Sequence, residues 1–269
     1  MVIYNFSFYR TPKIYFGDGQ FKKIASRVKE IGNNVLLFTG NKSFRETINW
    51  SFLVEELKCN NIIFFDEKIN TEPSPELIDT ICDKYRDKNI EIILSIGGGS
   101  VIDAGKAVSA MILKNEPIIH YLEGKKQKKS HDGQKIPFIA VPTTAGSGSE
   151  ATKNAVISDV GENGFKKSLR HDNFVPDIAI VDPNLQANCP QIIAKYSGLD
   201  AFIQLLESYT SRNSNPMMDS LIFDAIDLFN QSFIMIINGD DSIELYSDLA
   251  YAAMISGIGL SNTGLGIIH

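Results

Sequence analysis

The first half of the chain alternates short apolar runs with longer segments in which apolar residues recur at helical spacing. The short runs have the length of buried strands, and the longer segments have the length of amphipathic helices. This alternation is typical of βαβ units, which build a mainly parallel sheet with helices on its faces. The pattern predicts strands at residues 35–38, 62–65, 90–96 and 136–141, and helices at residues 44–57, 75–88 and 101–113.

The pattern changes near residue 185. From Pro190 onward the strand-like runs stop, and helical spacing predicts helices at residues 194–211, 216–230 and 241–257 and a last one near His269. We therefore expect an α/β domain of residues 1–185 followed by an all-α domain of residues 186–269. No low-complexity linker separates them in the sequence, so we expect direct packing with a ligand cleft between the two domains.

Composition is that of an ordinary globular protein, because 43% of the 269 residues are hydrophobic and 22% are charged. The formal net charge of −6 gives no basic excess that would attract nucleic acid. Three well-separated cysteines without a C-x-x-C pair indicate reduced thiols rather than a disulfide framework. The sequence shows neither a secretory signal nor an apolar run of membrane-spanning length. We expect a cytoplasmic protein that binds neither nucleic acid nor a membrane.

Three consecutive glycines at residues 97–99 join a predicted strand to a predicted helix. Such a turn is typical of phosphate-binding sites, because backbone N–H groups and the helix dipole point at the anion and glycine allows a positive φ. Ser100 is expected to cap the helix, and Asp103 to complete a capping box. The third glycine of the G-x-G-x-x-G pattern is replaced by Ile102. Taken alone, the turn fits a nucleotide site and a purely structural turn equally well.

A second loop, residues 142–150, strengthens the nucleotide hypothesis. It follows another predicted strand and consists mostly of hydroxyl-bearing and small residues. Such a loop offers many hydrogen-bond donors with little steric bulk, which suits a pyrophosphate and a ribose better than a packed core.

Several motifs together carry a family resemblance: residues 97–103 with Lys106, residues 142–147, Pro176-Asp177 and Asp182-Pro183. In these motifs the chain resembles the iron-containing (group III) alcohol dehydrogenases, and the likeness runs over its whole length. The resemblance implies a Rossmann-like nucleotide-binding domain, opened by a strand at residues 12–16 and a helix at residues 21–31, and then an all-α metal and substrate domain.

The resemblance also implies a nicotinamide cofactor, NADP or NAD, bound by the glycine turn and the second loop. The residues expected to bind it are Gly97, Gly98, Gly99, Ser100, Asp103, Thr143, Thr144 and Ser147. On the nicotinamide side we expect Asn154 and Lys166, with Lys167 as the alternative one position on.

The residues after the strand at 35–38 bear on the choice between the two cofactors. NAD-preferring relatives commonly carry an acidic residue at the position of Gly40, where it binds the ribose hydroxyls and repels a 2′-phosphate. Glycine removes that repulsion, and Lys42 and Ser43 are suited to bind the phosphate. We therefore expect NADP to be favoured over NAD.

Asp200, Gln204 and Glu207 share one face of a predicted helix by their spacing. The resemblance implies that Asp200 and His269 bind iron or zinc and that Gln204 stands where the family has a histidine. An amide oxygen binds these ions less well than imidazole does, so we expect weak or partial occupancy. The family's fourth ligand lies on a later segment, so we expect this helical domain to be incomplete. The other histidines match no metal position and are expected on the surface: His120, His131 and His171.

The activity implied by the resemblance is reversible hydride transfer between the cofactor and a small alcohol or aldehyde, assisted by the metal, in a homodimer. Three alternatives stay open. One is a nucleotide-binding relative that has lost catalysis, one is a metal-free reductase, and one is a polyol dehydrogenase of the glycerol type. The sequence identifies neither the substrate nor a catalytic residue.

Overall fold

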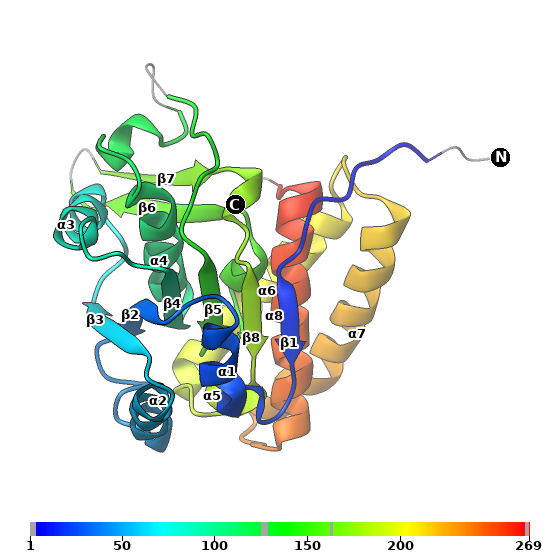
Figure 1. Cartoon of the computed structure of the whole chain (residues 1–269). Helices are drawn as coiled ribbons and strands as arrows, with labels where there is room; N and C mark the ends of the chain where they lie inside the picture. Colours follow the sequence, from blue (N-terminus) through cyan, green and yellow to red (C-terminus); the bar gives the residue numbers. More distant parts are fainter. Residues whose placement is uncertain (1–3, 125–128, 162–163, 267–268) are drawn as a thin grey trace.

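The computed structural model of the chain describes residues 4–124, 129–161, 164–266 and 269. At its centre is a sheet of parallel strands in the order β1-β8-β5-β4-β2-β3 (Figure 1). The strands are β1 (Lys13–Phe16), β2 (Asn34–Gly40), β3 (Ile63–Ile69), β4 (Ile92–Gly97), β5 (Phe138–Pro142) and β8 (Ile178–Val181). This sheet confirms the α/β class predicted from the alternation of apolar runs.

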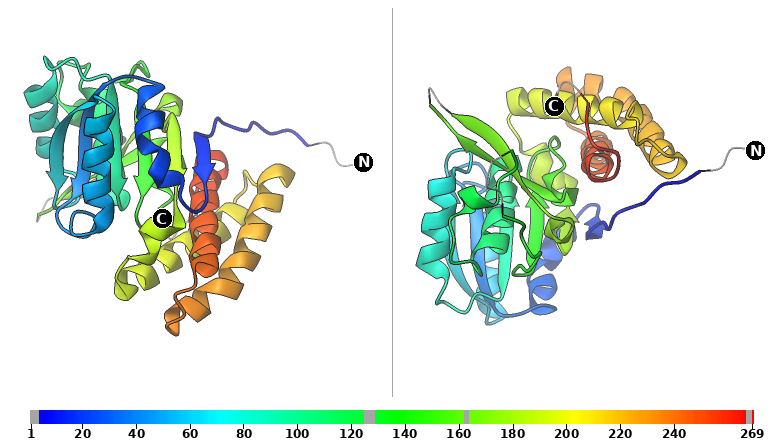
Figure 2. Two further views of the ribbon diagram at one scale, coloured as in Figure 1. Left: turned by 60° about the horizontal axis from the view of Figure 1, so that its bottom comes forward. Right: turned by 90° about the horizontal axis from the view of Figure 1, so that it is seen from above.

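Helices cover both faces of the sheet (Figure 2). They are α1 (Ile24–Lys29), α2 (Ile48–Cys59), α3 (Pro75–Tyr85) and α4 (Gly99–Met111). Leu36 and Phe38 of β2 belong to the buried cluster shared with α3 and α4, whereas Val35 and Leu37 belong to the cluster shared with α1 and α2. Because both faces are covered, the inner strands β4, β5 and β8 are buried along their whole length, whereas the edge strand β3 carries charged residues.

An antiparallel hairpin, β6 (Asn154–Asp159) and β7 (Phe165–Arg170), packs against α4 outside the main sheet. Ala155, Ile157 and Leu169 are its buried side chains in the core beside α4. A search for continuous apolar runs does not find this hairpin, because only Ala155, Ile157 and Leu169 of it belong to the core and β7 carries three basic residues in its sequence FKKSLR.

The chain after β8 is largely helical, as predicted, but the last helix expected near His269 is not seen, because residues 264–266 and 269 are not helical and residues 267–268 lie outside the described part. The chain after β8 forms α5 (Pro183–Ala187), α6 (Gln191–Tyr209), α7 (Pro216–Ile237) and α8 (Ile243–Thr263). α6, α7 and α8 pack on one another around a second core. α8 lies beside the edge strand β1 (Figure 1), and the rings of Phe16 and Tyr251 meet edge to face with centroids 6.2 Å apart. The helical part therefore packs directly on the sheet.

Among the described helices, α7 is long and apolar enough to fit a membrane span by length and composition. The same test is passed by helices in the core of soluble proteins. Met218, Ile222 and Phe229 on its inward face are buried in the helical core, and Phe223 and Ile234 on the other face are exposed. Packing in the core thus accounts for the apolar inward face.

Polar caps fix several of these boundaries. Asn215 Oδ1 accepts from Met218 N (3.1 Å) at the start of α7. Asp182 caps α5 by accepting from Asn184 N (3.1 Å), and its other oxygen accepts from Phe21 N (2.9 Å). The Asp182-Pro183 motif therefore ties the start of the helical part to the first helical turn of the chain.

The start of α4 differs from the expected capping box. The helix begins at Gly99 with Gly98 as its N-cap and has no side-chain cap. Ser100 lies inside the first turn, and Asp103 Oδ2 instead accepts from Val156 N of β6 (3.0 Å). An uncapped first turn leaves its backbone N–H groups to a ligand.

His131 is buried, which contradicts the surface position expected for it. Its Nε2 donates to Ala110 O (3.1 Å), its Nδ1 accepts from Gly133 N (2.9 Å), and its ring packs on Phe174. The neighbouring Gly133 and the sequence-distant Ala110 thus satisfy the neutral ring, and a local sequence pattern does not reveal the contacts with Ala110 and Phe174. His120 is exposed and His171 is half-buried.

Candidate cofactor and metal site

The glycine turn lies at the carboxyl end of β4 and packs closely on its surroundings. A Cβ on Gly97 would lie 2.6 Å from the Val101 side chain, and a Cβ on Gly99 would lie 2.8 Å from Ser147 Oγ. Neither glycine has a left-handed φ. Close approach, rather than the unusual backbone angle anticipated from the sequence, is therefore the reason for glycine here.

The second loop leaves the sheet next to this turn, because β5 pairs with β4. Thr143 N donates to Gly97 O (3.0 Å). Thr144 Oγ1 lies 3.3 Å from the position that a Cβ on Gly98 would take. Hydroxyl side chains of the second loop therefore border the turn along its length.

Two cavities lie on either side of the turn. The smaller has a volume of about 230 Å³, and its lining includes Gly40, Ser43, Gly97, Gly98, Thr143 and Thr144. The larger has a volume of about 890 Å³, and its lining includes Gly99, Ser100, Asp103, Ser147, Asn154, Lys166, Asp200, Gln204 and His269. Of the residues predicted for the site, only the exposed Lys42 lines neither cavity. The arrangement fits an elongated ligand that crosses the turn.

The larger cavity contains two buried oxygen atoms that lack a hydrogen-bond partner. Asp103 is 6% exposed and Asn154 is 7% exposed, yet Asp103 Oδ1 and Asn154 Oδ1 accept no hydrogen bond within the described parts of the chain, although Asp103 Oδ1 lies 3.9 Å from the Lys106 ammonium. An unpaired buried polar atom costs about 1–3 kcal/mol, so both atoms favour a ligand with N–H or O–H donors. Burial raises the pKa of the Asp103 carboxyl, although Lys106 and the Val156 N–H oppose the change.

One face of the hairpin forms a wall of the larger cavity. It carries Asn154, Val156 and Ser158 of β6 and their cross-strand partners Arg170, Ser168 and Lys166 of β7. The Lys166 ammonium lies 3.6 Å from a Glu72 oxygen. Lys167 also borders the cavity, but it lies on the opposite face of the strand and donates to Gly124 O (3.2 Å). Lys166 is thus the lysine that shares a face with Asn154.

The residues predicted as metal ligands come together at the same cavity. Gln204 Nε2 donates to Asp200 Oδ2 (3.0 Å) on α6. His269 Nε2 lies 3.2 Å from Asp200 Oδ1, and its Nδ1 contacts Glu207 Oε2. Burial acts to lower the pKa of His269, but the hydrogen bonds with Glu207 and Asp200 outweigh it and raise the pKa. Glu207 is therefore a partner of His269.

Both the nitrogen and the oxygen of the Gln204 amide have hydrogen-bond partners. Its Nε2 donates to Asp200, and its Oε1 accepts from Ser256 Oγ of α8 (3.1 Å). Within the described ranges, no three His, Cys, Asp or Glu side chains are arranged to hold a metal ion. Asp200 and His269 are donors that iron and zinc prefer, but two such donors do not complete a coordination shell. The described residues therefore do not fit a fully coordinated metal.

Sequence reasoning missed Ser256 and assigned Lys106 no role beyond its place in a family motif, although both residues contact the segments that carry the site residues. Ser256 contacts Gln204, and its Oγ also lies 3.5 Å from Gly146 O of the second loop. Lys106 is buried on α4 among alanine and valine neighbours. The available signal for both positions was a polar residue within a run of small and apolar residues on a buried helix, because such a residue needs partners.

Two family models match consecutive parts of the chain. Residues 11–183 match the model described as iron-containing alcohol dehydrogenase, and residues 194–269 match the model of the C-terminal region of the Fe-containing alcohol dehydrogenase family. Alcohol dehydrogenase 4 of Saccharomyces cerevisiae is 29% identical over 267 residues, which cover 97% of this chain and 68% of that protein. NAD-dependent methanol dehydrogenase of Bacillus methanolicus is 29% identical over 269 residues, which cover 98% of this chain and 68% of that protein.

Solved structures show the same fold. The alcohol dehydrogenase from Oenococcus oeni superposes with a TM-score of 0.87 at 26% sequence identity, covering 98% of this chain and 69% of that one.

Proposed function

Because the chain belongs to the iron-containing alcohol dehydrogenase family, we propose that it transfers a hydride between a nicotinamide cofactor and a small alcohol or aldehyde. The family membership confirms the resemblance seen in the glycine turn and the second loop. The observation that supports the proposal most strongly is the pair of cavities on either side of the turn. A dinucleotide has two halves joined by a pyrophosphate, and a helix N-terminus favours a pyrophosphate between them.

The protein's part in this reaction is to bind and orient the cofactor. The uncapped first turn of α4 and the hydroxyls of Thr143, Thr144 and Ser147 donate hydrogen bonds to the pyrophosphate and riboses. Asp103 Oδ1 and Asn154 Oδ1, which accept no hydrogen bond from the described residues, would accept hydrogen bonds from the cofactor half in the larger cavity. The bound cofactor supplies the hydride chemistry, and these contacts fix its orientation.

The substrate in this proposal occupies the larger cavity between the hairpin and α6. We place the boundary between the nucleotide-binding and helical domains near residue 185, so both domains line this cavity. Asp200 and His269 present a carboxylate and an imidazole to it. Enclosure between two domains excludes water, which strengthens polar contacts to the reacting oxygen.

We propose that a metal, iron or zinc, binds only weakly to Asp200, Gln204 and His269. The Gln204 amide must turn, or give up its bond to Asp200, before its oxygen can face an ion at this site. The same observation favours a second candidate function, a relative that binds the dinucleotide and either reduces carbonyls without a metal or has lost catalysis.

For cofactor choice, NADP over NAD remains our proposal. Gly40 and Ser43 line the smaller cavity, and a Cβ on Gly40 would meet no atom nearer than 4.0 Å. No acidic side chain at this position repels a 2′-phosphate. The basic neighbour Arg45 is held by Asp66 and stacks on Trp50, which leaves Lys42 and Ser43 as the proposed phosphate contacts.

Binding and turnover measured together test these proposals. NADPH and NADH would be titrated into the protein, and a panel of small aldehydes would then be assayed after chelation and after addition of Fe²⁺ or Zn²⁺. Dinucleotide binding with metal-stimulated turnover supports the alcohol dehydrogenase. Binding without turnover under every metal condition supports the second candidate, and absence of binding contradicts both. Light scattering on the same sample tests the proposed homodimer.

A further inference from the structure

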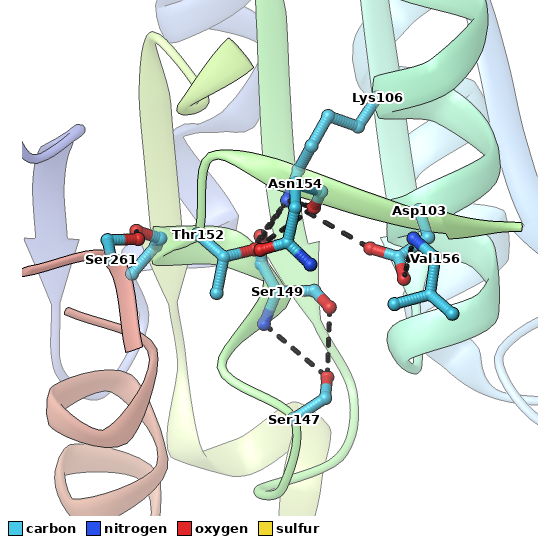
Figure 3. A network of polar contacts seen from close by, with 9 residues as sticks. Asp103, Lys106, Ser147, Ser149, Thr152, Asn154, Val156 and Ser261 are labelled. Atoms are coloured by element: carbon cyan, nitrogen blue, oxygen red, sulfur yellow. Dashed lines mark hydrogen bonds and ion pairs between the residues drawn. The ribbon is translucent and has the colours of Figure 1, made fainter. Parts of the chain in front are cut away.

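Lys106 of α4 is 1% exposed and lies within the polar network of Figure 3. Its ammonium donates to Ser149 O (2.7 Å), Thr152 Oγ1 (2.8 Å) and Asn154 O (2.8 Å). These three bonds use every donor of the group. The carboxylate of Asp103 is farther away, with its Oδ1 3.9 Å from Lys106 Nζ.

The three acceptors belong to one segment that borders the larger cavity. Ser149 opens the short helix η3 (Ser149–Ala151), and Asn154 opens β6. Ser147, just before η3, is the residue whose hydroxyl lies against Gly99. Lys106 therefore holds the main chain that presents cavity-lining side chains to the glycine turn.

The opposite side of this segment is held by α8. Ser261 Oγ donates to Ala151 O (3.2 Å), and Figure 3 shows Ser261 near Thr152 of this segment. The segment is thus fixed between α8 and α4, and α4 is the helix whose first turn forms the phosphate-binding end. Lys106 provides the contact between this segment and α4.

Stability alone does not account for a lysine at this position. Taking an ammonium group out of water is costly, and an apolar side chain of similar length would fill the space without that cost. Two of the three acceptors are backbone carbonyl oxygens, so the bonds fix the orientation of peptide groups rather than neutralise a charge.

We propose that Lys106 is a positioning residue for the dinucleotide, acting through the peptide groups of Ser149 and Asn154 on the larger-cavity half of the cofactor site. This assignment rests on the proposed function. It concerns the larger cavity only, because neither Ser149 nor Asn154 lines the smaller one.

The charge of Lys106 gives the proposal a pH signature. Burial lowers its pKa to about 8, although Asp103 and Glu150 oppose this and Lys135 adds to it. Those three residues are the charged groups that act on it, from α4, η3 and the segment before β5. The protonated ammonium donates all three bonds that orient the segment, whereas a neutral amine has only two N–H donors, so the affinity for NADPH should be highest below this pKa and fall as the pH rises through it.

Binding of NADPH and of 5′-AMP by the wild type and by Lys106→Met tests the proposal. AMP serves as the probe of the smaller cavity. We expect Lys106→Met to raise the dissociation constant of NADPH about tenfold or more, since several charge-assisted bonds are lost, and that of AMP by less than about twofold. The wild-type constant for NADPH should also rise above pH 8, and this rise should be absent in the variant.

Thr152→Val removes one acceptor and keeps the side-chain shape, so it should give a smaller increase for NADPH even if Lys106→Met does not fold. If Lys106→Met weakened the affinity for NADPH and AMP equally, or if neither variant changed the affinity for NADPH, the role of Lys106 would be overturned but the proposed function would not. A wild-type affinity that does not change above pH 8 would do the same. A wild-type protein that binds no dinucleotide would overturn the proposed function, and the role of Lys106 with it.

Discussion

Gly148 and Gly257 meet backbone to backbone. A Cβ on Gly148 would lie 2.5 Å from Gly257 N, and a Cβ on Gly257 would lie 2.2 Å from Gly148 O. Gly148 belongs to the second loop and has a left-handed φ of 61°, whereas Gly257 lies within α8. The loop that borders the glycine turn is therefore in direct contact with the helical part, and the two cannot move independently.

Gly257→Ala should disturb both parts at once. Overpacking a closed contact costs about 1–3 kcal/mol, and the loop must shift to accept the methyl group, so we expect lower stability together with weaker dinucleotide binding. Urea unfolding and titration calorimetry measure the two effects. Gly161→Ala is the matched control, because a Cβ there meets nothing within 4 Å. If Gly257→Ala changed stability and dinucleotide binding no more than this control, the contact between Gly148 and Gly257 would not couple the second loop to the helical part.

Gly40→Asp should change cofactor choice without changing the fold. A Cβ at this position meets no atom nearer than 4.0 Å, so the effect of the carboxylate is electrostatic. It repels a 2′-phosphate and accepts bonds from ribose hydroxyls, and we expect the ratio of NADH to NADPH affinity to rise about tenfold or more.

Gly40→Asn is the control that separates the effect of charge from the effect of size, because the asparagine side chain has nearly the same shape as aspartate but carries no charge. It should shift the ratio much less than the aspartate does. Tighter binding of NADH than of NADPH by the wild-type protein, or an unchanged ratio in Gly40→Asp, would refute the NADP preference.

The buried His131 should make the fold sensitive to mild acid. Burial lowers the pKa of His131 below its ordinary value of 6.5, so the folded protein keeps the ring neutral. Above that value both states are neutral and stability is complete. As the pH falls below it, only the unfolded chain gains the proton, and stability is lost until the lower folded pKa is reached.

His131→Phe should therefore lose less stability than the wild type between about pH 7.5 and about pH 5.5, by up to about 1 kcal/mol. Urea unfolding at both pH values gives the two differences. His120→Gln is the control, because His120 is exposed, and it should follow the wild type. Identical pH dependence in His131→Phe and the wild type would show that the ring does not resist protonation.

The sequence was sufficient wherever the determining contacts are local. Apolar runs predicted β2, β3, β4 and β5, and helical spacing predicted the helices that pack on them, whereas β1 and α1 followed from the family resemblance and β8 was not predicted. The glycine turn and second loop meet because their strands are neighbours. The predicted cap at Ser100 was wrong, because packing against the second loop and the hairpin decides how α4 begins. The hairpin and the buried His131 were missed for the same reason. Their environment comes from segments far away in the sequence, and no periodic pattern records it.

Substitutions of Gln204 test the metal proposal most directly. The Gln204 amide bridges Asp200 and Ser256. A metal ion can bind the amide oxygen, a weak ligand, only if these hydrogen bonds are broken. Gln204→His would replace that ligand with imidazole nitrogen, and we expect tighter binding of Zn²⁺ or Fe²⁺ by about 10- to 100-fold. Metal content after dialysis against a graded series of chelators measures this directly.

Two further variants identify what the wild-type amide contributes. Asp200→Ala removes the carboxylate that contacts both Gln204 and His269, so metal binding at this site should be lost. Gln204→Ala should weaken metal binding relative to the wild type if the amide oxygen turns toward the ion, and it should cost little stability at Ser256, because that hydroxyl also donates to Ala253 O (2.7 Å). Stoichiometric metal that survives Gln204→Ala unchanged would contradict the proposal, because the amide would then serve only to bridge Asp200 on α6 and Ser256 on α8.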